Sequence, residues 1–201
     1  MSIALIDYGA GNLTSVVKGL RAVGAEVTIA ATDAGLARCS GIVVPGVGHF
    51  AATAGVDEGL RHAIVRRIEA GVPLLGICLG MQLLFEGSDE APGAAGFGFI
   101  GGRCTRLSPP RPLKVPHVGW NTLETTRPAA ILEGIDTGVH VYFTHTFAAP
   151  VTPACAASTE HGSIFAAAVE RGHIAGVQFH PEKSGNAGLR ILANFVAMTR
   201  S

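Results

Sequence analysis

The sequence predicts a three-layer α/β fold built on a doubly wound, mostly parallel sheet with added antiparallel strands. Short apolar or β-branched runs recur through the first part of the chain, and segments with a helical pattern separate them. The second part is rich in glycine, proline and β-branched residues and shows little helical periodicity. Because strands that alternate with helices form parallel sheets with right-handed crossovers, the first part is expected to form the doubly wound core.

The first part supplies the parallel strands and the helices between them. Its short apolar runs are typical of strands that are buried on both faces of a sheet. We expect these strands at residues 3–7, 26–30, 41–45 and 74–77. Helices are expected at residues 13–23 and 56–70, the second of them long and amphipathic. Ligands of such sheets bind beyond the carboxyl ends of the strands, so the functional site is expected there.

The second part supplies antiparallel strands, loops and a closing helix. Residues 96–106 and 113–124 combine glycine and proline with β-branched residues, as strands joined by turns do. Further strands are expected at residues 139–143, 163–169 and 174–179, and a helix at residues 187–198. Because the sequence contains no internal repeat, low-complexity tract or linker, residues 1–201 are expected to form a single domain.

Charge and cysteine content exclude several classes of function. The chain has 201 residues, enough to bury a core without disulfides, and its 15 Lys and Arg residues equal its 15 Asp and Glu residues. This balance leaves no electrostatic footprint for nucleic acid or an anionic membrane. The four cysteines, at positions 39, 78, 104 and 155, lack the spacing of a zinc site or a C-x-x-C pair, so no metal is expected.

The same features indicate a compartment. A disulfide framework is not expected in a chain this long and rich in core residues, which favours a reducing environment. Asp7 interrupts the first apolar stretch and no basic segment precedes it, so no signal peptide is expected. The most apolar run, residues 72–85, is too short to span a bilayer. We therefore expect a cytoplasmic protein.

The most informative stretch is Gly76-Ile77-Cys78-Leu79-Gly80, where an apolar run gives way to a helical pattern. It matches the G-x-S-x-G nucleophile elbow, with sulfur in place of oxygen. Glycines two positions to either side give the clearance that this crowded strand-to-helix turn needs. A thiol at the start of a helix also has its thiolate favoured by the helix dipole and by free backbone N–H groups.

The candidate base is His180, in the segment Gln178-Phe179-His180-Pro181-Glu182 at the end of the last expected strand. Pro181 opposes helix at this point, so the segment is expected to be extended or turned. Residues two apart in an extended chain point to the same side, which lets Glu182 orient the imidazole. Cys78, His180 and Glu182 would then be nucleophile, base and orienting residue.

Plainer interpretations of these residues remain open at this stage. A buried cysteine is commonly a small hydrophobic residue, and an isolated histidine is commonly structural. An oxyanion would also need donors: the N–H of Leu79 is the first, and the segment Pro45-Gly46-Val47-Gly48 is a source of the second. That segment could equally be an ordinary tight turn.

The elbow and the His-Pro-Glu end resemble the triad of the class I glutamine amidotransferases, a flavodoxin-like family. Four further segments resemble the glutaminase subunits of imidazole glycerol phosphate synthase: residues 6–13 (IDYGAGNL), 45–48 (PGVG), 114–121 (KVPHVGWN) and 142–145 (YFTH). These matches extend over essentially the whole chain.

The resemblance implies a reaction and a partner. Cys78 would attack the carboxamide of glutamine, His180 would protonate the leaving ammonia, and water would hydrolyse the thioester. The ammonia would pass to a separate cyclase subunit in histidine biosynthesis, with no cofactor. A chain of 201 residues leaves no second domain for an acceptor substrate, consistent with a separate subunit.

The resemblance also implies roles for individual residues. The peptide between Gly46 and Val47 would rotate, so that the Val47 N–H completes the oxyanion hole only in the active complex. Residues near glutamine would be Gly48, Gln82, Glu90, Thr146 and Phe147. Residues facing the cyclase would be Asn12, Trp120 and Lys183.

Some of these positions have other interpretations. Gln82 could serve packing, Glu90 could be a solvated loop acid, and a single tryptophan such as Trp120 is often a core residue. Two segments depart from the family pattern: Thr146-Phe147 replaces a Ser-Tyr, and residues 100–102 (IGG) replace Ile-Pro-Gly. If a tyrosine hydroxyl contributes to binding in the family, affinity or coupling would differ here.

Three other functions are compatible with parts of the pattern. One is an amidotransferase subunit that serves pyridoxal phosphate or anthranilate synthesis. A second is a noncatalytic scaffold that stabilises a partner, and a third is a cysteine peptidase or esterase. His49, His117 and His145 share no ligand spacing, so they do not indicate a metal site.

Overall fold

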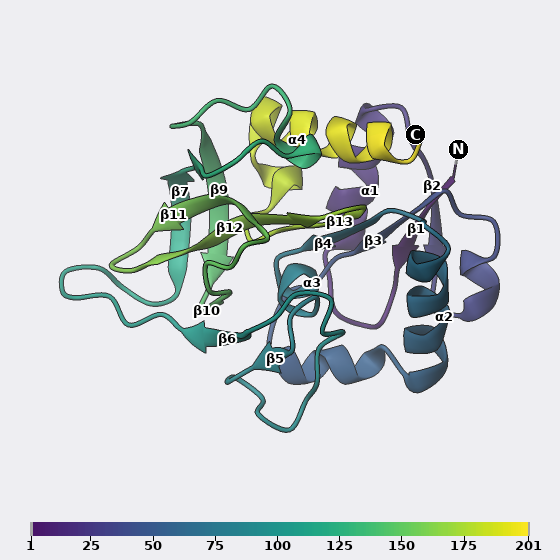
Figure 1. Ribbon diagram of the computed structural model, residues 1–201, viewed down its shortest axis with the longest axis horizontal. Coiled ribbons are helices and arrows are strands. Elements are labelled where there is room, and N and C mark those ends of the chain that lie inside the picture. The colour runs from purple at the N-terminus through teal and green to yellow at the C-terminus, as the bar shows by residue number, and fades with distance from the viewer. Residues whose placement is uncertain (1, 201) are drawn as a thin grey trace.

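A central sheet with helices on both faces forms the protein in the computed structural model, which describes residues 2–200 (Figure 1). Within those residues the main sheet has eight strands. In spatial order they are β2 (Glu26–Ala30), β1 (Ser2–Ile6), β3 (Gly41–Val44), β4 (Leu74–Ile77), β13 (Ile174–Val177), β12 (Ile164–Arg171), β11 (Cys155–Glu160) and β8 (Glu124–Thr125). The doubly wound, mostly parallel sheet with antiparallel additions is confirmed.

The parallel half of the sheet runs from β2 to β13. β3, β4 and β13 are buried along their whole length, as short continuous apolar runs predict. The last strand in sequence, β13, pairs in parallel with β4, and Val177 is opposite Ile77. Because both strands end at the same edge, the residues that follow them, Cys78 and Gln178, leave the sheet side by side.

The antiparallel half begins at β12, which pairs with β13 and then with β11. Two small sheets stand beside the main one. They consist of β10 (Phe147–Ala148), β6 (Arg103–Arg106) and β5 (Gly87–Ser88), and of β7 (His117–Thr122) with β9 (His140–His145). β7 and β9 pair along six residues each, and His117 is opposite His145.

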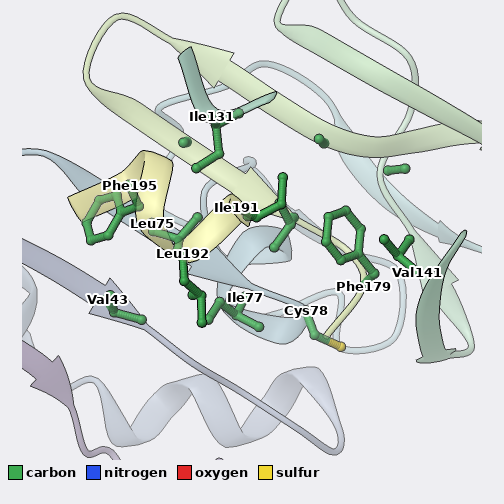
Figure 2. Close-up of a cluster of buried hydrophobic side chains, with 14 of the residues drawn as sticks. Val43, Leu75, Ile77, Cys78, Ile131, Val141, Phe179, Ile191, Leu192 and Phe195 are labelled. Atoms are coloured by element: carbon green, nitrogen blue, oxygen red, sulfur yellow. The ribbon is translucent and has the colours of Figure 1, made fainter. Parts of the chain in front are cut away.

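The helices divide the core into two layers. α1 (Leu13–Ala22) and α4 (Gly185–Met198) lie over one face of the sheet, and α2 (Glu58–Glu69) and α3 (Leu79–Gln82) lie over the other (Figure 1). Each pair contributes to its own cluster of buried apolar side chains. Figure 2 shows part of the first cluster, in which Ile77 and Cys78 at the end of β4 lie with α4 residues such as Ile191 and Leu192. Four 3₁₀ helices complete the described chain: η1 (Asp33–Leu36), η2 (Phe50–Gly55), η3 (Ala130–Leu132) and η4 (Pro181–Lys183).

Three expectations need correction. β2 is an edge strand and is mostly exposed, Ile29 to 55%, because its outer edge has no neighbouring strand. Residues 96–106 form a strand only at Arg103–Arg106, and the helix expected from residue 56 begins at Glu58. The side chain of Asp57 sets that start, since it accepts the N–H of Leu60 at 2.8 Å as an N-cap.

Among the described residues, no helix is both long and apolar enough to cross a membrane.

Candidate active site

Cys78 occupies a strained turn between β4 and α3. It is the residue between Ile77, which ends the strand, and Leu79, which begins the helix. Its φ of 54° and ψ of −107° make it the one non-glycine residue with positive φ in the described chain. Such a conformation costs roughly 1–3 kcal/mol and persists only where the surroundings enforce it. α3 is a single turn, so the helix dipole acting on the sulfur is smaller than the sequence suggested.

Glycine at positions 76 and 80 is required by close backbone contacts. A Cβ added to Gly80 would lie 1.8 Å from the carbonyl oxygen of Val44. A Cβ added to Gly76 would lie 2.5 Å from the carbonyl oxygen of Gly80. Both contacts are with backbone atoms, which cannot turn aside as a flexible side chain could. The two glycines therefore set the distance between β4, α3 and β3 and so place the thiol.

Replacing Gly80 by alanine is expected to destabilise the fold by about 3 kcal/mol or more, because the new methyl group overlaps the β3 backbone. Urea unfolding measures the effect. The matched control is Gly59→Ala, at an exposed position of α2 where the added Cβ meets only the side chain of Asp57, at 3.4 Å. Alanine there should leave the protein equally or slightly more stable. Equal unfolding midpoints for Gly80→Ala and wild type would contradict the close-contact argument.

His180 and Glu182 form a buried pair. Nδ1 of His180 lies 2.8 Å from Oε1 of Glu182, and both side chains are 2% exposed. Of the two conformations expected for this segment, extended or turned, the structure has the turn: Pro181 is the first residue of η4, where its ring is tolerated because the N–H it lacks has no partner at a helix start. The turn still brings Glu182 back onto the imidazole. Backbone bonds hold the segment to β9, since the His180 N–H donates to the carbonyl of Tyr142 at 2.9 Å.

The electrostatics of His180 favour a proton on the ring. Burial by itself would lower the pKa of His180, but the neighbouring Cys78 sulfur and the Glu182 carboxylate raise it to about 9. Nε2 is buried and has no hydrogen-bond partner among the described residues. In this resting arrangement the Cys78 sulfur thus raises the pKa of the imidazole because it is close to the ring, and Nε2 remains free to exchange a proton.

A cavity of about 290 Å³ opens beside the sulfur. Every residue expected near glutamine lines it, together with Val47, Cys78 and Leu79. The full lining is Val47, Gly48, Cys78, Leu79, Gln82, Glu90, Pro116, Thr144, His145, Thr146 and Phe147. Glu90 is not a freely solvated acid, because its Oε2 accepts the N–H of Phe50 at 2.7 Å. The histidine–glutamate pair lies behind this wall.

The expected oxyanion donor is occupied. The N–H of Leu79 donates to the carbonyl oxygen of Gly46 at 3.4 Å, a long bond by backbone standards. The Gly46 carbonyl therefore stands where an oxyanion would need the donor. In this arrangement the oxyanion site is not preformed.

Gln178 is a site residue that the sequence interpretation missed. Its Nε2 lies 3.6 Å from Sγ of Cys78, and its Oε1 accepts Nε2 of Gln82 at 3.1 Å. Nε2 of Gln82 also donates to the carbonyl of Phe147 at 2.9 Å. Both hydrogens of the Gln82 amide are thus committed, which leaves its oxygen as an acceptor. A signal was present: Gln178 precedes His180 by two residues, so both share one side of an extended chain.

A second missed feature is a hydrogen-bonded relay of two buried histidines. Nδ1 of His145 lies 2.9 Å from the carbonyl of Phe147, which can only accept, so His145 Nε2 accepts from Nδ1 of His117 at 3.0 Å. Asn121 donates to the remaining nitrogen of His117 at 3.3 Å. Burial is the largest cause that lowers the pKa of His145 to about 3 and of His117 to about 4. Both rings are therefore neutral near pH 7 and tie β7 to the cavity wall.

The residues expected at a partner interface lie outside the cavity. Trp120 on β7 is 56% exposed, which favours the interface over the core interpretation. Lys183 is exposed, with its ammonium 5.8 Å from the ring centroid of Tyr142. Asn12 is exposed and also caps α1, its side-chain oxygen accepting the N–H of Ser15 at 3.4 Å.

Fold and site geometry together define a class, that of α/β proteins in which an elbow thiol, a buried histidine–glutamate pair and a lined cavity suit acyl transfer. A family model described as glutamine amidotransferase class-I matches residues 4–198. Among solved structures, a glutamine amidotransferase crystal structure has a TM-score of 0.77 at 18% identity and covers 98% of this chain and 99% of its own, a likeness of fold alone.

Relatives at higher identity narrow the class. The imidazole glycerol phosphate synthase subunit HisH of Gloeobacter violaceus is 46% identical over 208 residues, covering 100% of this chain and 91% of the relative. The HisH subunit of Methanothermobacter thermautotrophicus is 42% identical over 200 residues, covering 99% and 100%. The chain belongs to the class I glutamine amidotransferases and, within them, to the HisH subunits of imidazole glycerol phosphate synthase.

Proposed function

We propose that this chain is a glutaminase that hydrolyses L-glutamine to glutamate and ammonia and delivers the ammonia to a cyclase subunit for histidine biosynthesis. The observation that carries the proposal is the strained elbow of Cys78 at the wall of a cavity, with the buried His180–Glu182 pair beside it. Membership of the HisH family supports this choice of substrate and partner.

The proposed reaction passes through a thioester. His180 takes the thiol proton of Cys78 as Sγ bonds to the carboxamide carbon of glutamine, and collapse of the tetrahedral adduct breaks the C–N bond. His180 supplies the proton that leaves with ammonia, a role that suits its raised pKa and unpartnered Nε2. Water then attacks the thioester, with His180 as base, and releases glutamate and the thiol. Glu182 holds the ring through Nδ1 and stabilises its positive charge.

The proposed binding groups are the cavity residues that no catalytic step uses. The side-chain oxygen of Gln82, whose NH₂ group already donates to Phe147 and Gln178, accepts a hydrogen bond from the ammonium group of glutamine. The half-buried carboxylate of Glu90 attracts the same ammonium group. Gly48, Thr146 and Phe147 border the same space. Phe147 carries no hydroxyl, so any contribution here comes from its backbone and ring. The N–H groups of Leu79 and Val47 are the proposed oxyanion donors, once the carbonyl of Gly46 has moved away.

The reaction is tested by glutamine hydrolysis and product formation with and without the cyclase. We expect slow release of ammonia from the chain alone and faster release in the complex, coupled to closure of the imidazole ring. Stimulation by a pyridoxal phosphate or anthranilate synthase, with none from the cyclase, would instead place the chain with another amidotransferase. Cleavage of peptides or esters without ammonia release would indicate a peptidase or esterase.

The proposed cyclase-facing surface consists of Asn12, Trp120 and Lys183, and Trp120 is the chain's single tryptophan. Because its indole is exposed, burial against the cyclase is expected to move its fluorescence to shorter wavelength. Trp120→Ala should weaken cyclase binding about thirtyfold, as loss of a central aromatic anchor does. Titration of the chain with cyclase, after subtraction of the cyclase signal, measures both effects.

A matched control for that titration is Ile29→Ala. Ile29 is 55% exposed on β2, on the other side of the molecule from β7 (Figure 1). Its removal should leave the affinity unchanged. Equal affinities for wild type and Trp120→Ala would exclude Trp120 from the interface.

We also propose that residues 1–201 form one glutamine amidotransferase domain and that it works in the cytoplasm. β1 and β13, the first and last strands of the described chain, share one sheet, which supports a single domain. All four cysteines are buried free thiols, which supports a reducing compartment. Limited proteolysis tests the first proposal and cell fractionation the second.

A further inference from the structure

The hydroxyl of Tyr8 is a buried polar group without a partner. Tyr8 follows β1 and is 8% exposed, and its oxygen makes no hydrogen bond in the described structure. Burial, and next the proximity of Cys78, raise the pKa of Tyr8 well above its ordinary value, so the group keeps its proton. Native proteins pair nearly all such groups, and an exception calls for a reason.

The position of this hydroxyl is specific. A Cβ added to Gly46 would lie 2.3 Å from the Tyr8 oxygen and 2.7 Å from Cβ of Leu79. The hydroxyl therefore lies directly against the backbone of Gly46. Neither Tyr8 nor Gly46 lines the cavity, whereas Val47, Gly48 and Leu79 do. Tyr8 thus stands behind the loop that forms one cavity wall.

The carbonyl oxygen of Gly46 and the oxyanion of the reaction need the same donor, the N–H of Leu79. At rest the carbonyl accepts the N–H of Leu79, through a bond of 3.4 Å. An elbow nucleophile needs that same N–H for the oxyanion, so the carbonyl has to leave before the reaction can proceed. Rotation of the peptide between Gly46 and Val47 is the smallest movement that frees it, and glycine at position 46 permits that rotation. A carbonyl turned away from the cavity would be buried and would need a new donor.

We propose that the Tyr8 hydroxyl is this donor, and that it holds the Gly46 carbonyl in the catalytically competent arrangement of the loop. The inference rests on the proposed glutaminase function. Tyr8 is a positioning residue: its hydroxyl is unpaired at rest and paired when Leu79 is free. The segment that follows Tyr8 leads within four residues to Asn12, on the proposed cyclase-facing surface. Contact between the cyclase and Asn12 can thus change the position of Tyr8 and, through it, the orientation of the peptide between Gly46 and Val47.

The test is Tyr8→Phe, in the chain alone and in the cyclase complex. Because the hydroxyl is unpaired at rest, its removal should leave the melting temperature equal or higher. The competent arrangement should lose its donor, so kcat for glutamine hydrolysis should fall about tenfold, the value of one hydrogen bond to a buried carbonyl. KM for glutamine should stay within twofold, since Tyr8 does not line the cavity.

The matched control is Thr199→Val, which removes a buried hydroxyl that donates to the carbonyl of Val196 at 2.7 Å, at the end of α4 and away from the cavity. At saturating cyclase its kcat should equal that of wild type. Unchanged kcat for Tyr8→Phe, in a preparation where wild type is active, would overturn the proposal. A lower kcat together with a higher KM and a lower melting temperature would also overturn it, because that pattern indicates a structural role. A wild-type chain inactive on glutamine with and without cyclase would instead refute the proposed function and, with it, this role of Tyr8.

Discussion

Replacement of Cys78 by alanine is expected to lower glutamine hydrolysis at least about 10⁴-fold, with the fold intact. Alanine keeps the backbone and the packing of the elbow but removes the sulfur that would bond the carboxamide carbon. Cys78 is 5% exposed and lies at the end of β4 among residues of the first core cluster (Figure 2), and it also lines the cavity. The steady-state release of ammonia in the cyclase complex measures the loss.

Cys39→Ala is the control for that experiment. Cys39 is also a buried free thiol, but its sulfur donates to the carbonyl of Leu36 at 3.2 Å and lies in the other core cluster. Its loss should lower stability and leave kcat unchanged. An electrophilic glutamine analogue should label wild type and Cys39→Ala once per chain and leave Cys78→Ala unlabelled. Retained turnover in Cys78→Ala would remove Cys78 as nucleophile, and absence of labelling in the wild-type complex would support a noncatalytic scaffold.

The parts of the fold that were predicted correctly are those in which local pattern and burial agree. β3 and β4 are short apolar runs with both faces covered, and each lies where its run does. β11 was not predicted, because its sequence, CAASTE, has three small or polar residues of weak strand propensity at its centre. It forms because β12 and β8 pair with it on either side. Such tertiary pairing is not visible in a local pattern.

The candidate site divides in the same way. Glu182 could be paired with His180 because the two are only two residues apart along the chain, and of the extended or turned conformations expected there, Pro181 begins a 3₁₀ turn. The hydrogen bond between His117 and His145 could not be predicted, because the two residues are 28 positions apart and meet only through the register of β7 against β9. The occupied N–H of Leu79 depends on the orientation of a single peptide at Gly46, for which a sequence holds no signal.

Replacement of Glu182 by glutamine should have the second large effect, lowering kcat/KM about 10³-fold. The amide keeps the shape of the side chain but neither stabilises an imidazolium nor fixes the tautomer, the loss seen when an orienting carboxylate becomes an amide. Burial of His180 is the largest influence on its pKa and acts downward. With the carboxylate gone, the pKa of His180 should therefore fall from about 9.

The same substitution should change how stability depends on pH. The pKa of His180 is raised in the fold from its ordinary 6.5 to about 9, so the protonated ring stabilises the folded state below pH 6.5, and that contribution is lost as the pH rises through about 9. The free energy of unfolding of wild type should thus decline across this window, and the decline should be smaller in Glu182→Gln, with the largest difference between the two proteins at the acid end. Urea unfolding at pH 6, 7.5 and 9 measures it, and Glu124→Gln, at an exposed position on β8, should follow wild type throughout. Parallel curves for wild type and Glu182→Gln would mean that the carboxylate does not hold the proton on His180, and would leave the imidazole without the charge that its role in proton transfer requires.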